Sequence, residues 1–301
     1  MEPVLLDSSS GPISYTARIV AAKRAIEQFH SSPLFKDPYV AALAGDEVNA
    51  LLSRWQAVAE AQAVPLEQVI AKRTRYIATR TKFMDDFLNS ALAQAEYKQV
   101  VILGAGLDTR AYRLAWSPGT TVYEVDCPEV LHYKAQVLQD ITPTCIYRPV
   151  SGDLATPDAK WAMGILDAGY QIIVPTIWLM EGVVMYLQEE EVHLLLQTIS
   201  ELSVPGSLLG MDGVKVGSVL AGQRARRADR GRVVRHWQFG NDDPKQLLAK
   251  YGWTAVVSEP QDIESGYGRY PQSMPIGIET TDQEDGRGVW LVNAVAENEY
   301  W

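Results

Sequence analysis

The chain has 301 residues, of which 47% are hydrophobic, and its formal net charge is −10 at pH 7. This length and composition suffice for a large core, in one elaborated domain or in two. The acidic balance argues against nonspecific nucleic-acid binding. The two cysteines, Cys127 and Cys145, are too few for a disulfide framework or a zinc site and suit a reducing compartment.

The sequence shows no sign of export or membrane insertion. No apolar stretch approaches the roughly 20 residues that cross a bilayer. The first residues, MEPVLLDSSSGP, contain no basic region followed by an apolar run. We therefore expect a cytoplasmic protein that binds neither membrane nor nucleic acid, and its oligomeric state stays open.

Hydrophobic spacing predicts two regions of different architecture. Helical periodicity runs through segments 15–29, 50–63 and 66–92. From Gln99 onward, short apolar runs alternate with helical patterns, which is typical of crossover units in a mostly parallel sheet. The predicted strands are 100–103, 121–126, 144–150, 177–181, 207–212, 253–259 and 289–296. The last two follow each other without an intervening helix pattern, which indicates an antiparallel edge.

These patterns predict an α/β protein with a Rossmann-like, seven-stranded, mostly parallel sheet. Residues 1–97 would form a helical N-terminal cap, and residues 98–301 would form the core that contains the sheet. A segment at about 214–240 interrupts the pattern after the fifth strand and is a candidate lid. In such sheets, ligands bind at the carboxyl ends of the strands, near the switch in strand order.

The first predicted strand ends in Gly104, Ala105 and Gly106, a turn that allows a ligand to approach the backbone closely. A nicotinamide-binding fingerprint, G-x-G-x-x-G, would need a third glycine where Thr109 stands. Methyltransferases bind S-adenosylmethionine, which has no phosphate, through a looser glycine turn. The turn by itself is also compatible with a tight strand-to-helix connection that binds nothing.

Acidic residues follow the next three strands. Asp126 ends the second strand, twenty residues beyond the second glycine, where an acid commonly binds ribose hydroxyls. Glu124 points the same way by strand alternation and is an alternative. Asp153 and Leu154 follow the third strand and suit the edge and face of an adenine, while Glu181 follows the fourth. A single acid is more often a helix cap or a solvated residue, but the series favours a ligand.

Arg80 is a separate clue within the helical segment 66–92. Its spacing from Ile77, Met84 and Phe87 places the cation on a face that also carries apolar side chains. An arginine buried there needs an anion, because an unpaired buried charge is costly. The anion could belong to an internal ion pair, or it could be the carboxylate of the cofactor's methionine half.

The segments LGAGLDTRAYRL, YEVDCPEV, SGDLA and WLMEGVVMYL, with TARIVAAKRA, LFKDPY and RTKFMDDFL upstream, resemble the leucine carboxyl methyltransferase-like family. This group of class I S-adenosylmethionine-dependent enzymes includes protein phosphatase carboxyl methyltransferases and bacterial polyketide methyltransferases such as the tetracenomycin enzyme. The resemblance covers about residues 14–260 and is greater to the bacterial members. It implies S-adenosylmethionine as the cofactor.

The resemblance also implies roles for matching positions. The implied cofactor-binding residues are Lys23, Arg80, Gly104, Ala105, Gly106, Asp126, Asp153, Leu154 and Glu181. Arg80 would bind the cofactor carboxylate, the glycine turn would line the methionine portion, and Asp126 would hold the ribose. Asp153 and Leu154 would hold the adenine, and Glu181 would lie near the amino group or the transferred methyl. In the first helix, Lys23 and Arg24 both stand where some relatives contact the cofactor.

Segment 215–236 carries seven lysines and arginines against a single acid, Asp229. It could be a solvated basic helix, but its place after the fifth strand makes it a candidate lid over the methyl acceptor. A basic lid favours a small anionic acceptor, either free or presented by an acidic carrier protein. The candidate acceptor-binding residues are Tyr15, Tyr186, Arg224, Arg226 and Arg227.

Methyl transfer is an in-line displacement at a sulfonium, in which the protein mainly positions the reactants. A carboxylate acceptor needs no base at neutral pH, whereas a phenol or alcohol usually does. We therefore expect an O-methyltransferase that acts on a carboxylate of a small natural product, with no metal. The alternatives are a hydroxyl or phenol O-methyltransferase that uses His236 as base, and a non-catalytic protein that binds S-adenosylmethionine.

Overall fold

The computed structural model describes residues 12–94, 97–227, 236–262, 266–270 and 288–297, and within these it leaves out the side chains of residues 12–15 and 222–227. The helices of the N-terminal region are α1 (Pro12–Glu27), α2 (Val40–Ala44), α3 (Glu47–Gln62) and α4 (Leu66–Leu92). The strands are β1 (Gln99–Leu103), β2 (Thr121–Asp126), β3 (Ile146–Ser151), β4 (Thr176–Met180), β5 (Leu208–Val214), β6 (Trp253–Ser258) and β7 (Val289–Ala296). The remaining helices are α5 (Arg110–Arg113), α6 (Pro128–Val137), α7 (Lys160–Asp167), the 3-10 turn η1 (Val184–Tyr186), α8 (Glu189–Glu201), α9 (Val216–Arg227) and α10 (Pro244–Ala249).

The strands form one sheet in the order β3-β2-β1-β4-β5-β7-β6. Strands β1 to β5 pair in parallel, and β7 is antiparallel to both of its neighbours, β5 and β6. This confirms the predicted seven-stranded α/β fold with an antiparallel edge. The strand order reverses between β1 and β4, so the carboxyl ends of these two strands mark the place where such sheets bind ligands.

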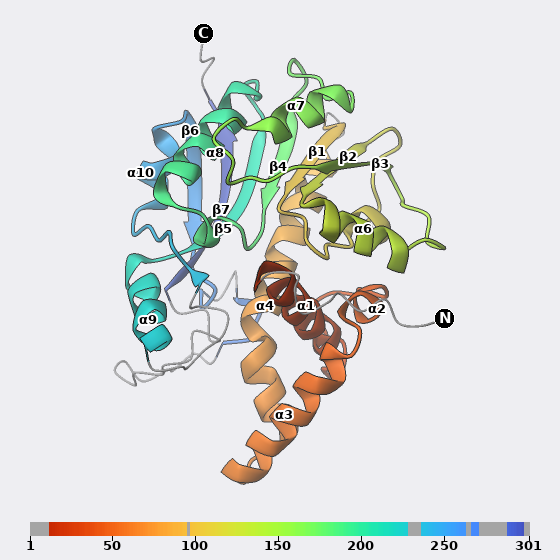
Figure 1. The fold of residues 1–301 in the computed structure, drawn as a ribbon, viewed down its shortest axis with the longest axis vertical. Helices are drawn as coiled ribbons and strands as arrows, with labels where there is room; N and C mark the ends of the chain where they lie inside the picture. The colour runs from red at the N-terminus through yellow and green to blue at the C-terminus, as the bar shows by residue number, and fades with distance from the viewer. Residues whose placement is uncertain (1–11, 95–96, 228–235, 263–265, 271–287, 298–301) are drawn as a thin grey trace.

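Side-chain alternation divides the core into two layers, one on each face of the sheet. In β1, Val100 and Ile102 join a cluster with α1, α3 and α4, whereas Val101 and Leu103 join a cluster with α7, α8 and α10. All five residues of β1 are buried, as expected for a central parallel strand. In Figure 1, α7 and α8 are drawn among the strands in the upper half of the view, whereas α1 and the labelled part of α4 lie below the strands.

Helix α4 connects the helical region to the sheet. Its C-terminal half packs on β5, where a Cβ at Gly210 would come within 2.7 Å of the Phe87 ring. The absence of a side chain at Gly210 therefore allows the helix to lie close to the strand. The N-terminal half of α4 projects from the body beside α3 (Figure 1). Residues of α4 and β1 belong to the same core cluster. The division of the chain at residues 97 and 98 stays a prediction.

Strand β3 begins two residues later than the predicted segment 144–150. Thr144 instead completes the loop after α5: its amide donates to Ala111 O over 2.9 Å and its hydroxyl donates to Leu114 O over 2.7 Å. These bonds turn Thr144 away from the sheet, so strand pairing starts at Ile146. Strands β2 and β7 and helix α4 have the predicted boundaries.

Candidate functional site

The glycine turn after β1 has a backbone that only glycine adopts easily. Gly104 and Gly106 have φ values of +62° and +50°, in the left-handed region. A Cβ at Gly104 would lie 2.6 Å from Val183 Cγ2, so this position has no room for a side chain. At Gly106 the nearest atom to an added Cβ is 3.8 Å away, so this position is strained but not crowded.

Asp126 is bound to the glycine turn from the end of β2. Its carboxylate accepts hydrogen bonds from Gly106 N over 2.6 Å and from Cys127 N over 2.7 Å. Burial raises the pKa of Asp126, although the two backbone amides oppose that rise. The carboxylate therefore lies where the sequence analysis expects the ribose, next to the turn and at the strand end.

Glu124, the alternative to Asp126, binds side chains of α6 and β3. It is fully buried, and its carboxylate accepts from Lys134 Nζ of α6 over 2.6 Å and from the Tyr147 hydroxyl of β3 over 2.7 Å. A carboxylate held by a lysine and a tyrosine on the neighbouring elements is part of the packing between β2, β3 and α6. Of the two acids, Asp126 is the one that contacts the glycine turn.

The residues expected at the adenine follow β3. Asp153 is exposed, and its carboxylate accepts from Ala155 N over 2.9 Å. Leu154 is half-buried, and its Cδ1 lies 3.7 Å from the position of a Cβ at Gly104. The structure therefore brings Leu154 to the glycine turn, while the exposed Asp153 lies beside it in the chain.

Arg80 is buried at the carboxyl ends of β4 and β5, where it forms two ion pairs. Its Nε lies 2.9 Å from Glu181 Oε1, and its Nη1 lies 3.1 Å from Asp212 Oδ2. Its guanidinium also stacks over the Tyr76 ring, 5.4 Å from the ring centroid. The structure thus joins two predicted residues, Arg80 and Glu181, and adds Asp212 and Tyr76, which the sequence analysis did not single out.

A second arginine, Arg110 in α5, extends this cluster to the glycine turn. It lies 2.8 Å from Glu181 Oε2 and 2.7 Å from Asp85 Oδ1 of α4, and it also pairs with Asp108. Burial of Glu181 opposes ionisation, but Arg110 and Arg80 outweigh it and lower the pKa of this carboxyl. The sequence analysis did not single out Arg110, whose partners Glu181 and Asp85 lie on other elements.

The first helix joins the same cluster through Arg24. Arg24 donates to Leu107 O over 3.2 Å and to the Thr109 hydroxyl over 3.1 Å, and it pairs with Asp37. Lys23 is half-buried. The position of Arg24 ties α1 to the segment after the glycine turn, and the expected cofactor contact of Lys23 stays a prediction.

The candidate acceptor residues are only partly described. Tyr186, in η1, is half-buried, and burial raises the pKa of its hydroxyl. The side chains of Tyr15, Arg224, Arg226 and Arg227 lie outside the described part of the structure. His236 is half-buried and stands two residues before Gln238, whose backbone N–H donates to Met185 O over 2.7 Å. This bond attaches the chain just after His236 to η1.

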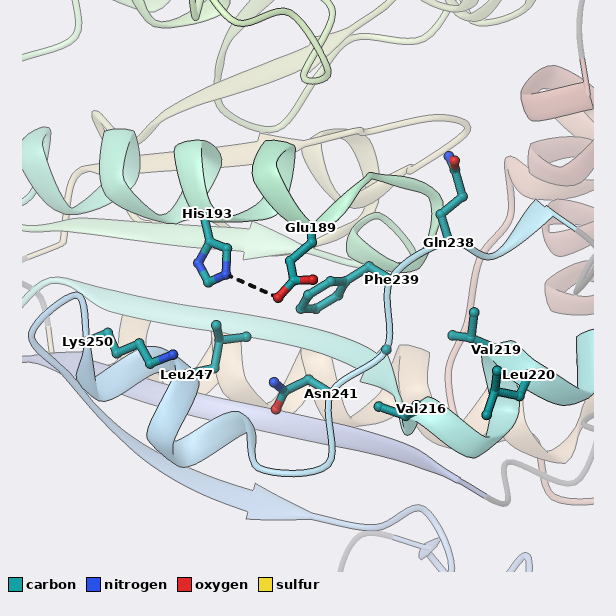
Figure 2. Close-up of a pocket in the computed structure, with 11 residues that line it drawn as sticks. Glu189, His193, Val216, Val219, Leu220, Gln238, Phe239, Asn241, Leu247 and Lys250 are labelled. Carbon is teal, nitrogen blue, oxygen red and sulfur yellow. Dashed lines mark ion pairs between the residues drawn. The ribbon is translucent and has the colours of Figure 1, made fainter. Parts of the chain in front are cut away.

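A cavity of about 450 Å³ opens between α8, α9 and α10 (Figure 2). Apolar side chains of α9 and the ring of Phe239 line it, together with His193 and Glu189 of α8. The Nε2 atom of His193 lies 3.8 Å from Glu189 Oε1. None of the predicted cofactor-binding residues lines this cavity. Within the described residues, no cluster of three or more metal-ligating side chains is found, and no helix is long and apolar enough to span a membrane.

The family follows from a comparison with known sequences. A model of the leucine carboxyl methyltransferase family matches residues 17–200, more than half of the chain. The chain belongs to the leucine carboxyl methyltransferase family. A protein of Mycobacteroides abscessus, provisionally named an S-adenosyl-L-methionine-dependent methyltransferase, is 35% identical over an alignment 310 residues long, which covers 94% of this chain and 93% of the relative. A Streptomyces coelicolor protein with the same kind of name is 36% identical over 290 residues, which cover 93% and 94%.

Solved structures share the fold of this leucine carboxyl methyltransferase family member. A protein of Streptomyces avermitilis has a TM-score of 0.57 at 16% identity and covers 93% of this chain and 96% of its own. A Thermobifida fusca protein, provisionally named a methyltransferase, has a TM-score of 0.54 at 16% identity and covers 94% of each chain. These two likenesses concern the fold alone. Family membership and the sequence relatives make the protein an S-adenosylmethionine-dependent methyltransferase.

Proposed function

We propose that this methyltransferase transfers the methyl group of S-adenosylmethionine to a carboxylate oxygen of a small anionic natural product or metabolite, either free or attached to a carrier protein. The cofactor supplies the activated methyl carbon. The chain's own residues then have two tasks: to bind the cofactor at the switch point, and to hold the acceptor oxygen in line with the transferred methyl.

The residues at the switch point fit the cofactor's polar groups. Asp126 offers a carboxylate beside the glycine turn, and each of its oxygens retains a lone pair beyond the backbone bond that it accepts. Glu181 Oε2 is buried and lies 2.8 Å from Arg110 Nη2 without hydrogen-bond geometry, so it can also accept from an ammonium hydrogen. At Gly106 an added Cβ would meet no atom closer than 3.8 Å, so the turn is less crowded here than at Gly104.

The charge of the buried cluster also fits a cationic cofactor. Its members, joined by ion pairs, are Arg24, Arg80, Arg110, Arg113, Asp37, Asp85, Asp108, Glu181 and Asp212. Four arginines face five carboxylates, so one negative charge is left over. S-adenosylmethionine carries an ammonium and a sulfonium against one carboxylate, so its net charge complements that of the cluster.

The observation that carries the carboxylate acceptor is the state of the acid–base groups around the strand ends. Glu181 is ion-paired, and its lowered pKa makes it a weak base. Burial raises the pKa of Tyr76 and of Tyr186, so both hydroxyls stay protonated. An acceptor that is already ionised needs no base, and carboxylates are ionised well above their pKa of about 4.

The product distinguishes this proposal from the hydroxyl alternative. The purified enzyme would be incubated with labelled cofactor and host extract, and the labelled product would be treated with mild alkali. A methyl ester releases labelled methanol, whereas a methyl ether does not. For a carboxylate acceptor, the rate should stay flat across neutral pH. An alkali-stable product, together with an inactive His236→Ala variant that still binds cofactor, would establish the hydroxyl acceptor instead.

The basic segment gives a second test of the anionic acceptor. Replacing Arg224, Arg226 and Arg227 by alanine should raise the KM for the acceptor more than it changes cofactor affinity. Equal effects on both would remove the support that the basic segment gives to an anionic acceptor. Tight cofactor binding without turnover across a broad acceptor panel would favour the non-catalytic alternative.

A further inference from the structure

Asp212 stands out among the buried groups that neither the sequence motifs nor the family resemblance assigns. It lies in the carboxyl half of β5 and is 0% exposed. Its Oδ1 accepts from Gly182 N over 2.5 Å, and its Oδ2 accepts from the Tyr76 hydroxyl over 2.7 Å and from Arg80 Nη1 over 3.1 Å. A single carboxylate therefore connects β5, α4 and the turn after β4.

The two groups that Asp212 holds determine the position of the predicted cofactor ligands. Gly182 directly follows Glu181, so the bond to its amide fixes the turn that carries that carboxylate. The bond to Nη1 fixes one edge of the Arg80 guanidinium, while Glu181 holds Nε. A Cβ at Gly182 would come within 3.1 Å of Arg80 Nη1, so the absence of a side chain at Gly182 leaves room for the guanidinium.

Tyr76 acts only as a hydrogen-bond donor to Asp212. Burial and the nearby Asp212 raise its pKa well above the ordinary value, so the phenol stays protonated and donates to Asp212. Tyr76 and Arg80 are one helical turn apart on α4, so both approach Asp212 from the same helix face. The tyrosine ring packs under the guanidinium while its hydroxyl holds the carboxylate.

We propose that Asp212 is a positioning residue for cofactor binding: it orients the Arg80 guanidinium and the Glu181 turn toward the methionine half of S-adenosylmethionine. This inference rests on the proposed cofactor site, but not on the identity of the acceptor. The buried ion pair between Asp212 and Arg80 is a poor way to stabilise the fold, because the attraction between two buried charges rarely exceeds the cost of removing them from water. Its effect should therefore appear in cofactor affinity and should depend on Arg80.

The test is a double-mutant cycle on affinity for S-adenosylmethionine and its demethylated product, measured by calorimetry without any acceptor. Asp212→Asn keeps the shape and one acceptor oxygen for Gly182 but removes the charge that faces Arg80. We expect Asp212→Asn and Arg80→Lys each to weaken binding at least tenfold. Because both changes disturb the same guanidinium, the double variant should bind within threefold of the weaker single variant.

A second cycle supplies the control. Asp212→Asn combined with Asp126→Ala should show losses that multiply, because no contact joins the two acids and Asp126 lies at the ribose end. Multiplying losses in the Arg80 cycle as well, or unchanged binding by Asp212→Asn, would overturn the positioning role. A parent protein that binds neither ligand would overturn the cofactor site together with this inference.

Tyr76→Phe serves if Asp212→Asn does not fold. It removes one hydrogen bond to Asp212 and retains the ring under the guanidinium. We expect about threefold weaker cofactor binding in the parent and no further loss in the Arg80→Lys background. An equal loss in both backgrounds would assign Tyr76 and Asp212 to packing alone.

Discussion

At the scale of single residues, Arg80 has a structural role in the buried cluster and a proposed role in cofactor binding. The sequence left open whether its anion is internal or belongs to the cofactor. The structure supplies two internal anions, Glu181 and Asp212, which use Nε and Nη1 of the guanidinium. The proposed contact with a cofactor carboxylate would use the third nitrogen, Nη2.

The Arg80 contacts predict different effects for two substitutions. Arg80→Ala leaves Glu181 and Asp212 buried with fewer partners and should cost about 3–5 kcal/mol of unfolding free energy. Arg80→Lys retains the charge but cannot form a fork, so it should fold and bind cofactor more weakly. Urea unfolding and calorimetry would measure the two effects. An Arg80→Lys variant that is folded and binds cofactor normally would leave Arg80 with a structural role only.

Substitutions at Asp126 and at Glu124 together test which acid binds the ribose. Asp126→Ala should weaken cofactor binding by about 1.5–3 kcal/mol, the contribution of hydrogen bonds to a charged group. Glu124→Gln removes the charge opposite the buried Lys134, so it should lower the melting temperature and leave cofactor affinity of the folded protein unchanged. The reverse pattern in calorimetry would move the ribose site to Glu124.

At the scale of elements, the turn between β1 and α5 has to satisfy the backbone, the neighbouring strand and the ligand together. The amide of Ala105 donates to Val125 O over 3.1 Å, which anchors the turn to β2. Val183, from the turn after β4, packs over Gly104. The two glycines therefore differ: an added Cβ would clash with Val183 at Gly104, but would make only ordinary contact, 3.8 Å from Ala17 Cβ, at Gly106.

This difference predicts distinct outcomes for three glycine-to-alanine substitutions. Gly104→Ala should destabilise the protein most, because its Cβ meets Val183. Gly106→Ala should cost about 1–2 kcal/mol of stability through its positive φ and should also weaken cofactor binding. Gly119→Ala is the control: it has a φ of +81° and no atom within 4 Å of the added Cβ, so strain is its only effect. Thermal melts would measure the stability of all three variants, and calorimetry would measure their cofactor affinity. If Gly106→Ala and Gly119→Ala had the same cofactor affinity, the turn would have no role in binding.

At the scale of the whole molecule, the buried arginine–carboxylate cluster makes stability depend on pH. Burial opposes ionisation of Asp37, Asp108 and Glu181, but neighbouring arginines lower the pKa of all three. Each therefore adds stability above its unfolded pKa of about 4 and loses that contribution as the pH falls through the folded value. Burial raises the pKa of Glu124 and of Asp126, which act in the opposite direction.

Three of these five buried carboxyls have a lowered pKa and two have a raised one, so the protein should lose stability in acid. The free energy of unfolding in urea should be nearly constant from about pH 7 to 5.5 and should fall below about pH 4.5. Asp108→Asn should be less stable at neutral pH and should show a shallower acid dependence. Asp158→Ala, which removes an exposed ion pair with Lys160, should follow the parent. Stability that is unchanged down to pH 3 would show that the cluster does not control acid unfolding.

The sequence by itself determined the fold class and the cofactor, and it predicted the strand ends at which the cofactor would bind. The periodicity of α4 and the apolar runs of β1, β2 and β7 are local patterns, and local patterns fix which segments become helices and strands. The glycines after β1 and the acid after β2 were readable because the carboxyl ends of parallel strands meet at one edge of a sheet. These signals were sufficient to predict the fold and the cofactor.

Only the tertiary structure decided which charged groups pair with one another. Arg80 meets Glu181 and Asp212, which lie 101 and 132 residues away in the chain, and Arg110 meets Asp85 of α4. Glu124 and Asp126 are equivalent by strand alternation, and only the packing of α6 and β3 assigns Glu124 to Lys134 and Tyr147. Periodicity reports the face on which a side chain lies, but the partner across that face depends on how distant elements pack, and no local pattern records that.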